Sequence, residues 1–248
     1  MRRNILITGA SAGLGEEMAR QFAAKGHNLA LAARREDRLK ALREELTAAY
    51  PGQTVVIHKL DVNDHDQVFE VFRAAESELG TLDRVIVNAG LGKGAPIGTG
   101  RFDANRATAM TNFVAALAQA EAAMEIFRAR NVGHLVLIAS VSAMRGLPKN
   151  LTTYAASKAA VGSLAEGLRM ELLGTPIKVS AIFPGYIRSE MNDQVANTPL
   201  IVDTVTGVRA MVTAIDQEKG KAFVPPWPWA PLARVMKYAP LALLKRMI

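Results

Sequence analysis

The chain of 248 residues contains no cysteine. Disulfide bonds, thiolate nucleophiles and cysteine-ligated metals are therefore excluded, and a reducing, cytoplasmic location fits this composition. Histidine is scarce as well, and no two of its copies have the spacing that places metal ligands on one face of a helix. These copies are His27, His58, His65 and His134. We expect no metal site.

Long uncharged runs are also missing. No stretch of the sequence approaches the roughly 20 apolar residues that span a lipid bilayer. The basic start of the chain is followed by a short apolar run that ends in glycine, which is unlike a signal peptide. We expect a cytoplasmic protein, and its hydrophobic content of 50% is enough for a substantial core.

Acidic residues are absent after Glu218. The segment from Lys219 to Ile248 holds six basic residues and accounts for +6 of the net charge of +7. Because the rest of the chain is nearly neutral, we expect no nucleic-acid partner.

Short β-rich apolar runs alternate with segments of helical pattern. This order predicts an α/β fold, a single-domain, Rossmann-like, doubly wound parallel β-sheet with helices on both faces. We expect residues 1–248 to form one domain, with ligands bound beyond the carboxyl ends of the strands. The predicted strands are Asn4–Thr8, Asn28–Ala33, Thr54–Lys59, Arg84–Asn88, His134–Ser140, Lys178–Phe183 and Ala222–Val224, and the predicted helices include Leu14–Lys25, Glu36–Ala49 and Asp64–Glu78.

The first predicted strand ends in TGASAGLG, residues 8–15, and a helix follows. Glycine permits a tight turn and a close approach of the backbone to a pyrophosphate, and the helix start offers free N–H groups. A glycine cluster can also be a plain turn, but at the end of a first strand it favours dinucleotide binding. The expected contacts are Gly9, Ser11, Gly13, Leu14 and Gly15.

The second predicted strand ends in two arginines, Arg34 and Arg35, where NAD-binding sites usually place an acid. Guanidinium groups can hold a 2′-phosphate through charge-assisted hydrogen bonds. The alternative is a solvated arginine pair with Glu36 and Asp37 as partners. The missing acid favours NADP(H), with Arg34 as the main phosphate contact.

The stretch YAASK places Tyr154 and Lys158 four residues apart, on one face of a helix. Such a pair is often an ordinary surface pair. It can also be a proton donor, since a cation within about 4–6 Å lowers the pKa of a phenol. The sequence around the pair decides between these interpretations.

Seven segments, in this order, resemble the short-chain dehydrogenase/reductase family. They are TGASAGLG (8–15), LDV (60–62), NAG (88–90), MTNFVAAL around Asn112, IASVSA around Ser140, YAASK (154–158) and PG (184–185). The match runs from about Asn4 to Met191, and later residues match only in general layout. The resemblance implies that Asn112, Ser140, Tyr154 and Lys158 are the catalytic set. It also implies cofactor contacts from Tyr154, Lys158, Asp61, Val62, Asn88, Ala89, Gly90, Pro184, Gly185, Ile187 and Ser189.

Two positions depart from the family pattern. The interval from Ser140 to Tyr154 is one residue longer than the family more often shows, which makes Ser142 a competing serine. We prefer Ser140 because it directly ends a predicted strand. Ala12 stands where NADP-preferring members often have a basic residue, so Arg34 is the main support for NADP(H).

Small residues dominate the helix that contains Tyr154, and they permit close packing against neighbours. They are Ala155, Ala156, Ala159, Ala160 and Gly162. In the resembling family this helix forms part of a dimer interface, so we expect a homodimer or homotetramer.

Residues 190–248 are expected to form a substrate lid and an apolar, basic C-terminal extension. Thr198 and Pro199 look like the N-cap and first residue of a helix that continues to about Glu218. The proline-rich end can fold over the active site and line an apolar pocket, cover a partner subunit, or rest on an anionic membrane as a peripheral contact. The sequence leaves these three alternatives open.

The leading hypothesis is an NADP(H)-dependent oxidoreductase that acts on CH–OH groups and interconverts an apolar ketone and a secondary alcohol. Tyr154 would donate or accept the proton, and Ser140 would orient the substrate oxygen. Alternatives are a 3-oxoacyl-thioester reductase of the same family and a non-catalytic NADP-binding sensor. A membrane-associated scaffold rests on the C-terminal segment alone.

Overall fold

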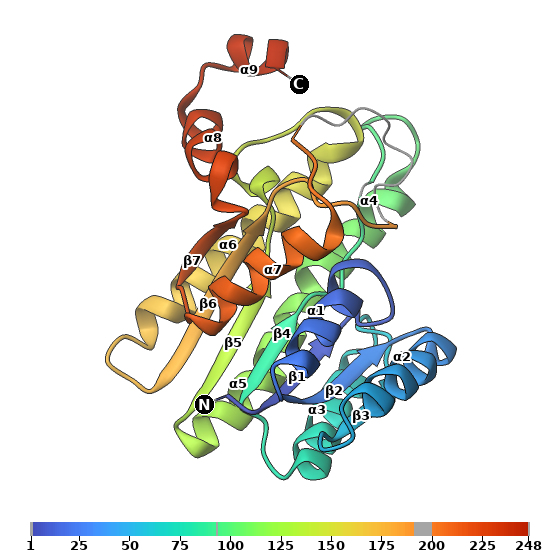
Figure 1. Ribbon diagram of the computed structural model, residues 1–248. Helices are drawn as coiled ribbons and strands as arrows, with labels where there is room; N and C mark the ends of the chain where they lie inside the picture. The colour runs from blue at the N-terminus through green and yellow to red at the C-terminus, as the bar shows by residue number, and fades with distance from the viewer. Residues whose placement is uncertain (1, 93, 191–199, 248) are drawn as a thin grey trace.

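A computed structural model of the chain describes residues 2–92, 94–190 and 200–247. Its centre is a seven-stranded sheet in the order β3-β2-β1-β4-β5-β6-β7, and all pairs of neighbouring strands are parallel (Figure 1). The chain winds outward from β1 in one direction and from β4 in the other, which confirms the predicted doubly wound sheet. The strands are β1 (Asn4–Thr8), β2 (Asn28–Ala33), β3 (Val55–Lys59), β4 (Arg84–Val87), β5 (Gly133–Ile138), β6 (Ile177–Pro184) and β7 (Lys221–Val224).

Two hydrophobic layers enclose the sheet, as the uninterrupted apolar strands predict. Within β1, Leu6 faces one layer, and Ile5 and Ile7 face the other. The first layer is closed by α3 (His65–Leu79), α5 (Ala115–Arg130) and α6 (Thr152–Glu171), and the second by α1 (Gly13–Ala24), α2 (Glu36–Ala49) and α7 (Thr204–Asp216).

The remaining elements lie around the carboxyl edge of the sheet. They are α4 (Phe102–Ala109), the π-helical turn η1 (Met110–Val114), the 3-10 turns η2 (Val141–Met144) and η3 (Lys149–Leu151), α8 (Pro226–Tyr238) and α9 (Leu241–Met247). Figure 1 shows α8 and α9 beyond the carboxyl end of β7, projecting away from the layers. A kink at Trp227 separates the first residue of α8 from its regular part.

The helix predicted to begin at Pro199 begins instead at Thr204. Before it, Val202 forms a β-bridge with Ile187, which holds the chain extended. The Asp203 carboxylate then accepts a 2.8 Å hydrogen bond from the N–H of Thr206 and acts as the N-cap. Thr198 and the proposed first residue Pro199 lie outside the described residues.

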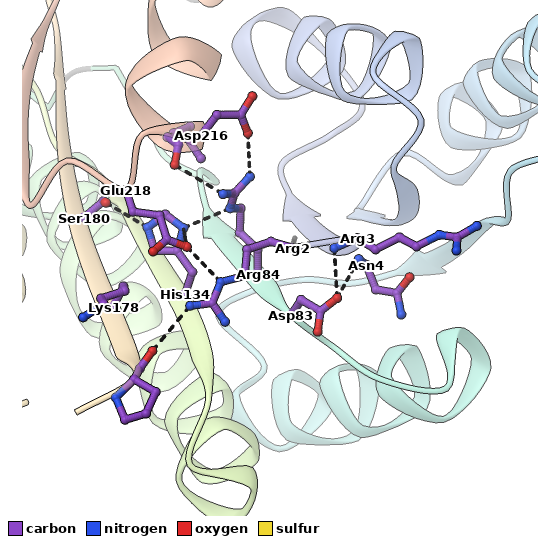
Figure 2. A network of polar contacts seen from close by, with 12 residues as sticks. Arg2, Arg3, Asn4, Asp83, Arg84, His134, Lys178, Ser180, Asp216 and Glu218 are labelled. Atoms are coloured by element: carbon purple, nitrogen blue, oxygen red, sulfur yellow. Dashed lines mark hydrogen bonds and ion pairs between the residues drawn. The ribbon is translucent and has the colours of Figure 1, made fainter.

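At the amino edge of the sheet, a buried polar network ties β4, β5 and β6 to the end of α7 (Figure 2). Arg84 donates from Nε to Nδ1 of His134 at 2.9 Å and pairs with Asp216 at 2.9 Å. A guanidinium can only donate, so Nδ1 of His134 accepts and its Nε2–H donates to Ser180 Oγ at 2.8 Å. The network therefore joins four elements through a neutral imidazole.

Within the described ranges, no helix has the length and apolar character needed to cross a bilayer.

Candidate active site

A cavity of about 640 Å³ opens at the carboxyl edge of the sheet. It lies beyond the ends of β1, β2, β4, β5 and β6, where ligands bind in doubly wound folds. Most of the site residues expected from the sequence line it: Gly9, Ser11, Gly13, Leu14, Arg34, Arg35, Asp61, Val62, Asn88, Ala89, Gly90, Ser140, Tyr154, Lys158, Pro184, Gly185, Ile187 and Ser189. Gly15 and Asn112 stand behind the wall, in contact with residues that line it.

The glycine turn is held by Asn88. The Asn88 side chain donates from Nδ2 to the Thr8 carbonyl at 3.0 Å, and Thr8 Oγ1 accepts from the N–H of Asn88 at 3.1 Å. Gly9 has a φ of +65°, and a Cβ there would lie 2.9 Å from Cα of Ala89. A Cβ on Gly15 would collide with the Gly9 carbonyl oxygen. These two glycines therefore allow the TGASAGLG and NAG segments to touch, which explains both motifs structurally.

The turn leads into α1 without blocking its first N–H groups. Among the described residues, no side chain caps the helix at Ala12. Unpaired N–H groups and the helix dipole favour an anion at this point. A Cβ on Gly13 would lie 3.4 Å from Cβ of Ser189, so the turn also borders the segment after β6. This cradle fits the pyrophosphate of a dinucleotide.

Arginine side chains gather at the end of β2. Arg35 folds back on the glycine turn and donates from Nε to Ser11 Oγ at 3.2 Å. Its NH1 group also lies 3.3 Å from Glu190, and the same carboxylate pairs with Arg38 at 2.5 Å. Arg34 is exposed and lines the cavity beside Arg35. Arg35 thus brings a guanidinium to the turn where Ala12 supplies no charge.

Asp61 and Val62 follow β3 and line the same end of the cavity. The Asp61 carboxylate accepts a 3.0 Å hydrogen bond from the N–H of Asn63, so it stabilises its own turn. Val62 is buried in the first hydrophobic layer.

Tyr154, Lys158 and Ser140 line the cavity together. Ser140 follows β5, and its Oγ accepts from the N–H of Ser142 at 3.1 Å, which fixes the hydroxyl at the start of η2. The Ser140 side chain hydrogen-bonds Tyr154, which supports Ser140 over Ser142 as the serine of the site. Lys158 is buried and donates from Nζ to the Ile138 carbonyl at 2.8 Å.

The electrostatics of the pair differ from the sequence-based expectation. Burial raises the pKa of Tyr154, and the hydrogen bond with Ser140 offsets only part of that rise. Burial also lowers the pKa of Lys158 to about 8. The pKa of Tyr154 therefore shifts in the direction opposite to the expected one, because burial disfavours the charged phenolate more than the Ser140 hydroxyl favours it.

Asn112 lies in the π-helical turn η1, and π-turns within helices often occur at functional sites. Its Oδ1 accepts from the N–H of Leu91 at 2.7 Å, and its Nδ2 donates to the Leu91 carbonyl at 2.9 Å. A Cβ on Gly90 would lie 3.1 Å from Asn112 Oδ1 and 3.5 Å from Lys158 Nζ. Asn112 therefore fixes the NAG segment directly behind the lysine.

The segment after β6 carries residues that the sequence-based prediction missed. Tyr186 lines the cavity, and its ring meets that of Trp229 edge-on, with centroids 5.3 Å apart. Gly185 lies directly against the Trp229 indole, where a Cβ would collide. Tyr186 immediately follows the PG motif at a strand end, which is the signal that could have found it. Other missed lining residues include Leu91, Asn150, Leu151 and Glu190.

The C-terminal helices rest beside the cavity. Helix α8 packs against β7 and η2, and Arg145, just after η2, donates to the carbonyls of Lys237 and Ala239 at 3.1 and 3.3 Å. The described part of residues 226–247 contributes nothing to the cavity lining. The tail therefore supports the active-site loop from outside.

Comparisons with known proteins agree with this architecture. The sequence model for short chain dehydrogenases matches residues 3–199. An uncharacterized oxidoreductase of Mycobacterium tuberculosis is 54% identical over 245 residues, which cover 99% of this chain and 97% of that protein.

Solved structures share the fold. A short-chain dehydrogenase from Sphingobium yanoikuyae in complex with NADPH has a TM-score of 0.83 and 27% identity, covering 98% of this chain and 95% of its own. One from Burkholderia phymatum in complex with NAD has a TM-score of 0.84 at 22% identity, covering 94% and 92%, and this likeness shows the fold alone. Proteins of this architecture thus bind NADP or NAD, and the chain is an oxidoreductase of the short-chain dehydrogenase/reductase family.

Proposed function

We propose that the protein is an NADP(H)-dependent oxidoreductase that interconverts a ketone and a secondary alcohol. The observation that carries this proposal is the meeting of Tyr154, Ser140 and Lys158 in a cavity that Arg34 and Arg35 also line. Residues 1–248 would act as one catalytic domain in the cytoplasm, with residues 190–248 as substrate lid and extension.

The proposed chemistry divides between the cofactor and the side chains. The bound nicotinamide would supply or accept the hydride at the carbonyl carbon. In reduction, Tyr154 gives its hydroxyl proton to the carbonyl oxygen, and the raised pKa keeps this proton in place at neutral pH. The Ser140 hydroxyl holds the same oxygen, and a preorganised donor of this kind contributes about 3–4 kcal/mol in the transition state.

Lys158 and Asn112 would maintain this proton supply. With a pKa of about 8, Lys158 is largely charged at neutral pH but close enough to titration to release a proton. Asn112 Oδ1 and Lys158 Nζ both face Gly90. We assign Asn112 the role of holding the path by which a proton from solvent reaches Lys158.

Preference for NADP(H) is supported by three arginines near the end of β2. Arg34 and Arg35 line the cavity, Arg35 is held by Ser11, and Arg38 lies one helical turn beyond. A 2′-phosphate offers acceptors for these guanidinium groups, whereas a ribose 2′-hydroxyl calls for an acid that β2 lacks.

An apolar ketone is the favoured substrate because Leu91, Val141, Leu151 and Tyr186 line the cavity together with Tyr154. A 3-oxoacyl thioester is the alternative within the family. A non-catalytic NADP-binding sensor is disfavoured, since sensing needs no proton donor.

A homodimer or homotetramer is supported by α6. Ala155 is buried and Gly162 packs against Phe183, but Ala156 and Ala159 are exposed. With Ser163 and Gly167, also exposed, they form a row of small residues on which another helix can pack closely.

A panel of ketones and alcohols tests the activity and the cofactor together. We expect oxidation of NADPH with apolar ketones, and weaker use of NADH. Preferred use of NADH would contradict the role of the arginines, and no turnover with any carbonyl or alcohol would favour the sensor.

The variant Tyr154→Phe tests the proton donor. We expect turnover to fall at least about a thousandfold, since general acid catalysis and the activation it brings are lost, while NADPH binding measured by fluorescence stays close to that of the wild type. Ser142→Ala is the matched control and should retain most activity. Substantial turnover by Tyr154→Phe would contradict the mechanism.

A further inference from the structure

Helices α8 and α9 carry several exposed large apolar side chains. Trp227 is 78% exposed, Tyr238 77%, Leu241 68%, Val235 50% and Leu243 49%. Isolated apolar side chains are ordinary on protein surfaces, but a concentration within one short segment marks an interaction site.

The inward side of the same segment is anchored to the protein. Trp229, Ala233, Ala239 and Leu244 are buried, and Arg145 donates to the carbonyls of Lys237 and Ala239. The exposed side chains therefore belong to the second face of an anchored amphipathic segment, and burying them needs a partner outside this chain.

The charges on this segment have one sign. Arg234, Lys237 and Lys245 are exposed among the apolar side chains, and the sequence has no acidic residue after Glu218. Aromatic and leucine side chains interleaved with basic residues are typical of helices that lie in the headgroup region of an anionic membrane. A second copy of this segment would oppose like charges, so it fits less well.

The segment also adjoins the opening of the active site. Trp229 on its inner side contacts Gly185 and Tyr186, and Tyr186 lines the cavity. In Figure 1 both helices extend beyond the carboxyl edge of the sheet, so a flat surface can reach them before it meets the sheet layers.

We propose that the exposed face of α8 and α9 docks the protein on bilayers that contain anionic lipids, beside the opening of the cavity. The docking surface consists of Trp227, Val235, Tyr238, Leu241 and Leu243 with Arg234, Lys237 and Lys245. We infer from this docking that the substrates of the enzyme are carbonyl or alcohol compounds that partition into membranes. This last step rests on the proposed function, whereas the docking itself does not.

Flotation with vesicles tests the docking. The full-length protein is mixed with vesicles of phosphatidylcholine alone or of phosphatidylcholine with phosphatidylglycerol. We expect binding to the anionic vesicles to exceed binding to the neutral ones by about tenfold or more, and to weaken with salt. Equal binding to both, or binding to neither, would overturn the proposal.

Variants locate the surface. Leu241→Ser with Leu243→Ser should reduce vesicle binding about tenfold. Met170→Ser with Leu173→Ser is the matched control, because these side chains are 72% and 74% exposed in the last turn of α6 and just after it. Equal binding by both variants and the wild type would refute the assigned face.

Intrinsic fluorescence gives an independent readout. The chain has two tryptophans, of which Trp227 is exposed and Trp229 is buried. Anionic vesicles should shift the emission of the wild type to shorter wavelength but leave the emission of the Trp227→Phe variant unchanged.

Light scattering tests the alternative occupant. If it shows a dimer that Leu241→Ser with Leu243→Ser dissociates, and vesicles do not bind, the occupant is a second copy and the membrane proposal fails. NADPH oxidation with a soluble ketone is measured in parallel, so loss of docking is distinguished from failure of the proposed activity.

Discussion

Glu190 balances the charge at the end of β2. Its carboxylate lies between the guanidinium groups of Arg35 and Arg38, and these two side chains lower its pKa. A carboxylate in this position uses the same donors that a 2′-phosphate would use. Because all three side chains are exposed, their ion pairs are weak and a phosphate can replace the carboxylate.

Removing the negative charge of Glu190 should strengthen the binding of nucleotides that carry a 2′-phosphate. We expect Glu190→Gln to bind 2′,5′-ADP about threefold more tightly than the wild type, since exposed ion pairs of this kind are worth little. Binding of 5′-AMP should not change, because it lacks the 2′-phosphate. Calorimetric titration of both nucleotides measures the difference. Glu36→Gln is the control, because Glu36 pairs with Lys40 instead. An equal change for both nucleotides would contradict competition at the phosphate.

Single residues show what sequence spacing can and cannot predict. The positions of Tyr154, Lys158 and Ser140 around one cavity follow from the motifs, because each lies at a strand end or on the helix beyond it. The hydrogen bond from Arg35 to Ser11 cannot be predicted from the motifs, since sequence spacing does not determine the conformation of a long side chain. The raised pKa of Tyr154 also depends on burial, which a local i, i+4 pattern does not contain.

Strands β6 and β7 and helix α8 meet where β6 runs into the PG motif. Gly185 donates from its N–H to the Val224 carbonyl at 2.9 Å and lies against the Trp229 indole. The first turn of α8 thus packs on the same backbone that lines the cavity. The C-terminal helices and the site are consequently coupled at Gly185, beside the ring contact between Tyr186 and Trp229.

A side chain at position 185 should disturb both the packing of α8 and the cavity. We expect Gly185→Ala to lower the free energy of unfolding by about 1–3 kcal/mol, because overpacking forces α8 or the turn to move, and to weaken NADPH binding. Urea unfolding and a binding titration measure the two effects. Gly52→Ala in the turn before β3 is the control, since a Cβ there meets nothing within 4 Å and the backbone is not left-handed, and it should be neutral or stabilising. Wild-type stability and binding in Gly185→Ala would refute the coupling.

At the scale of elements, the hydrophobic periodicity of the sequence predicted the positions of the strands. All seven strands occur within two residues of their expected bounds, and α2 has the expected range. The start of α7 was wrong, because the Thr-Pro pattern says nothing of the β-bridge between Ile187 and Val202 that keeps the preceding chain extended. The π-helical turn around Asn112 was also beyond prediction, since the sequence pattern does not contain the contact between the Asn112 amide and Leu91 that accompanies it.

In the whole molecule, the candidate active site and the buried polar network lie at opposite edges of the sheet. The cavity occupies the carboxyl edge, and the Arg84 network occupies the amino edge. Arg84 is 2% exposed, and its ion pair with Asp216 joins the start of β4 to the end of α7. Neither His134 nor Arg84 has a motif that predicts this pairing, which arises only when β4 and β5 lie side by side.

This network makes the stability of the molecule depend on pH. Burial lowers the pKa of His134 well below its ordinary 6.5, and the positive charge of Arg84 adds to the effect. Burial also lowers the pKa of His27 and His58. Below about pH 6.5 the unfolded chain therefore binds protons that the folded chain does not, and stability falls as the pH falls. Above that pH these histidines are neutral in both states and contribute no slope.

We therefore expect the urea midpoint to decrease from about pH 7 to pH 5. Each histidine that remains neutral costs at most about 1.4 kcal/mol per pH unit below its ordinary pKa. Unfolding curves at several pH values measure this slope. His134→Asn should be less stable than the wild type at pH 7, because its hydrogen bonds to Arg84 and Ser180 are altered, but should show a shallower decrease toward pH 5. A wild type whose stability rises toward pH 5, or a variant with an unchanged slope, would contradict the assignment of His134 as a buried neutral imidazole.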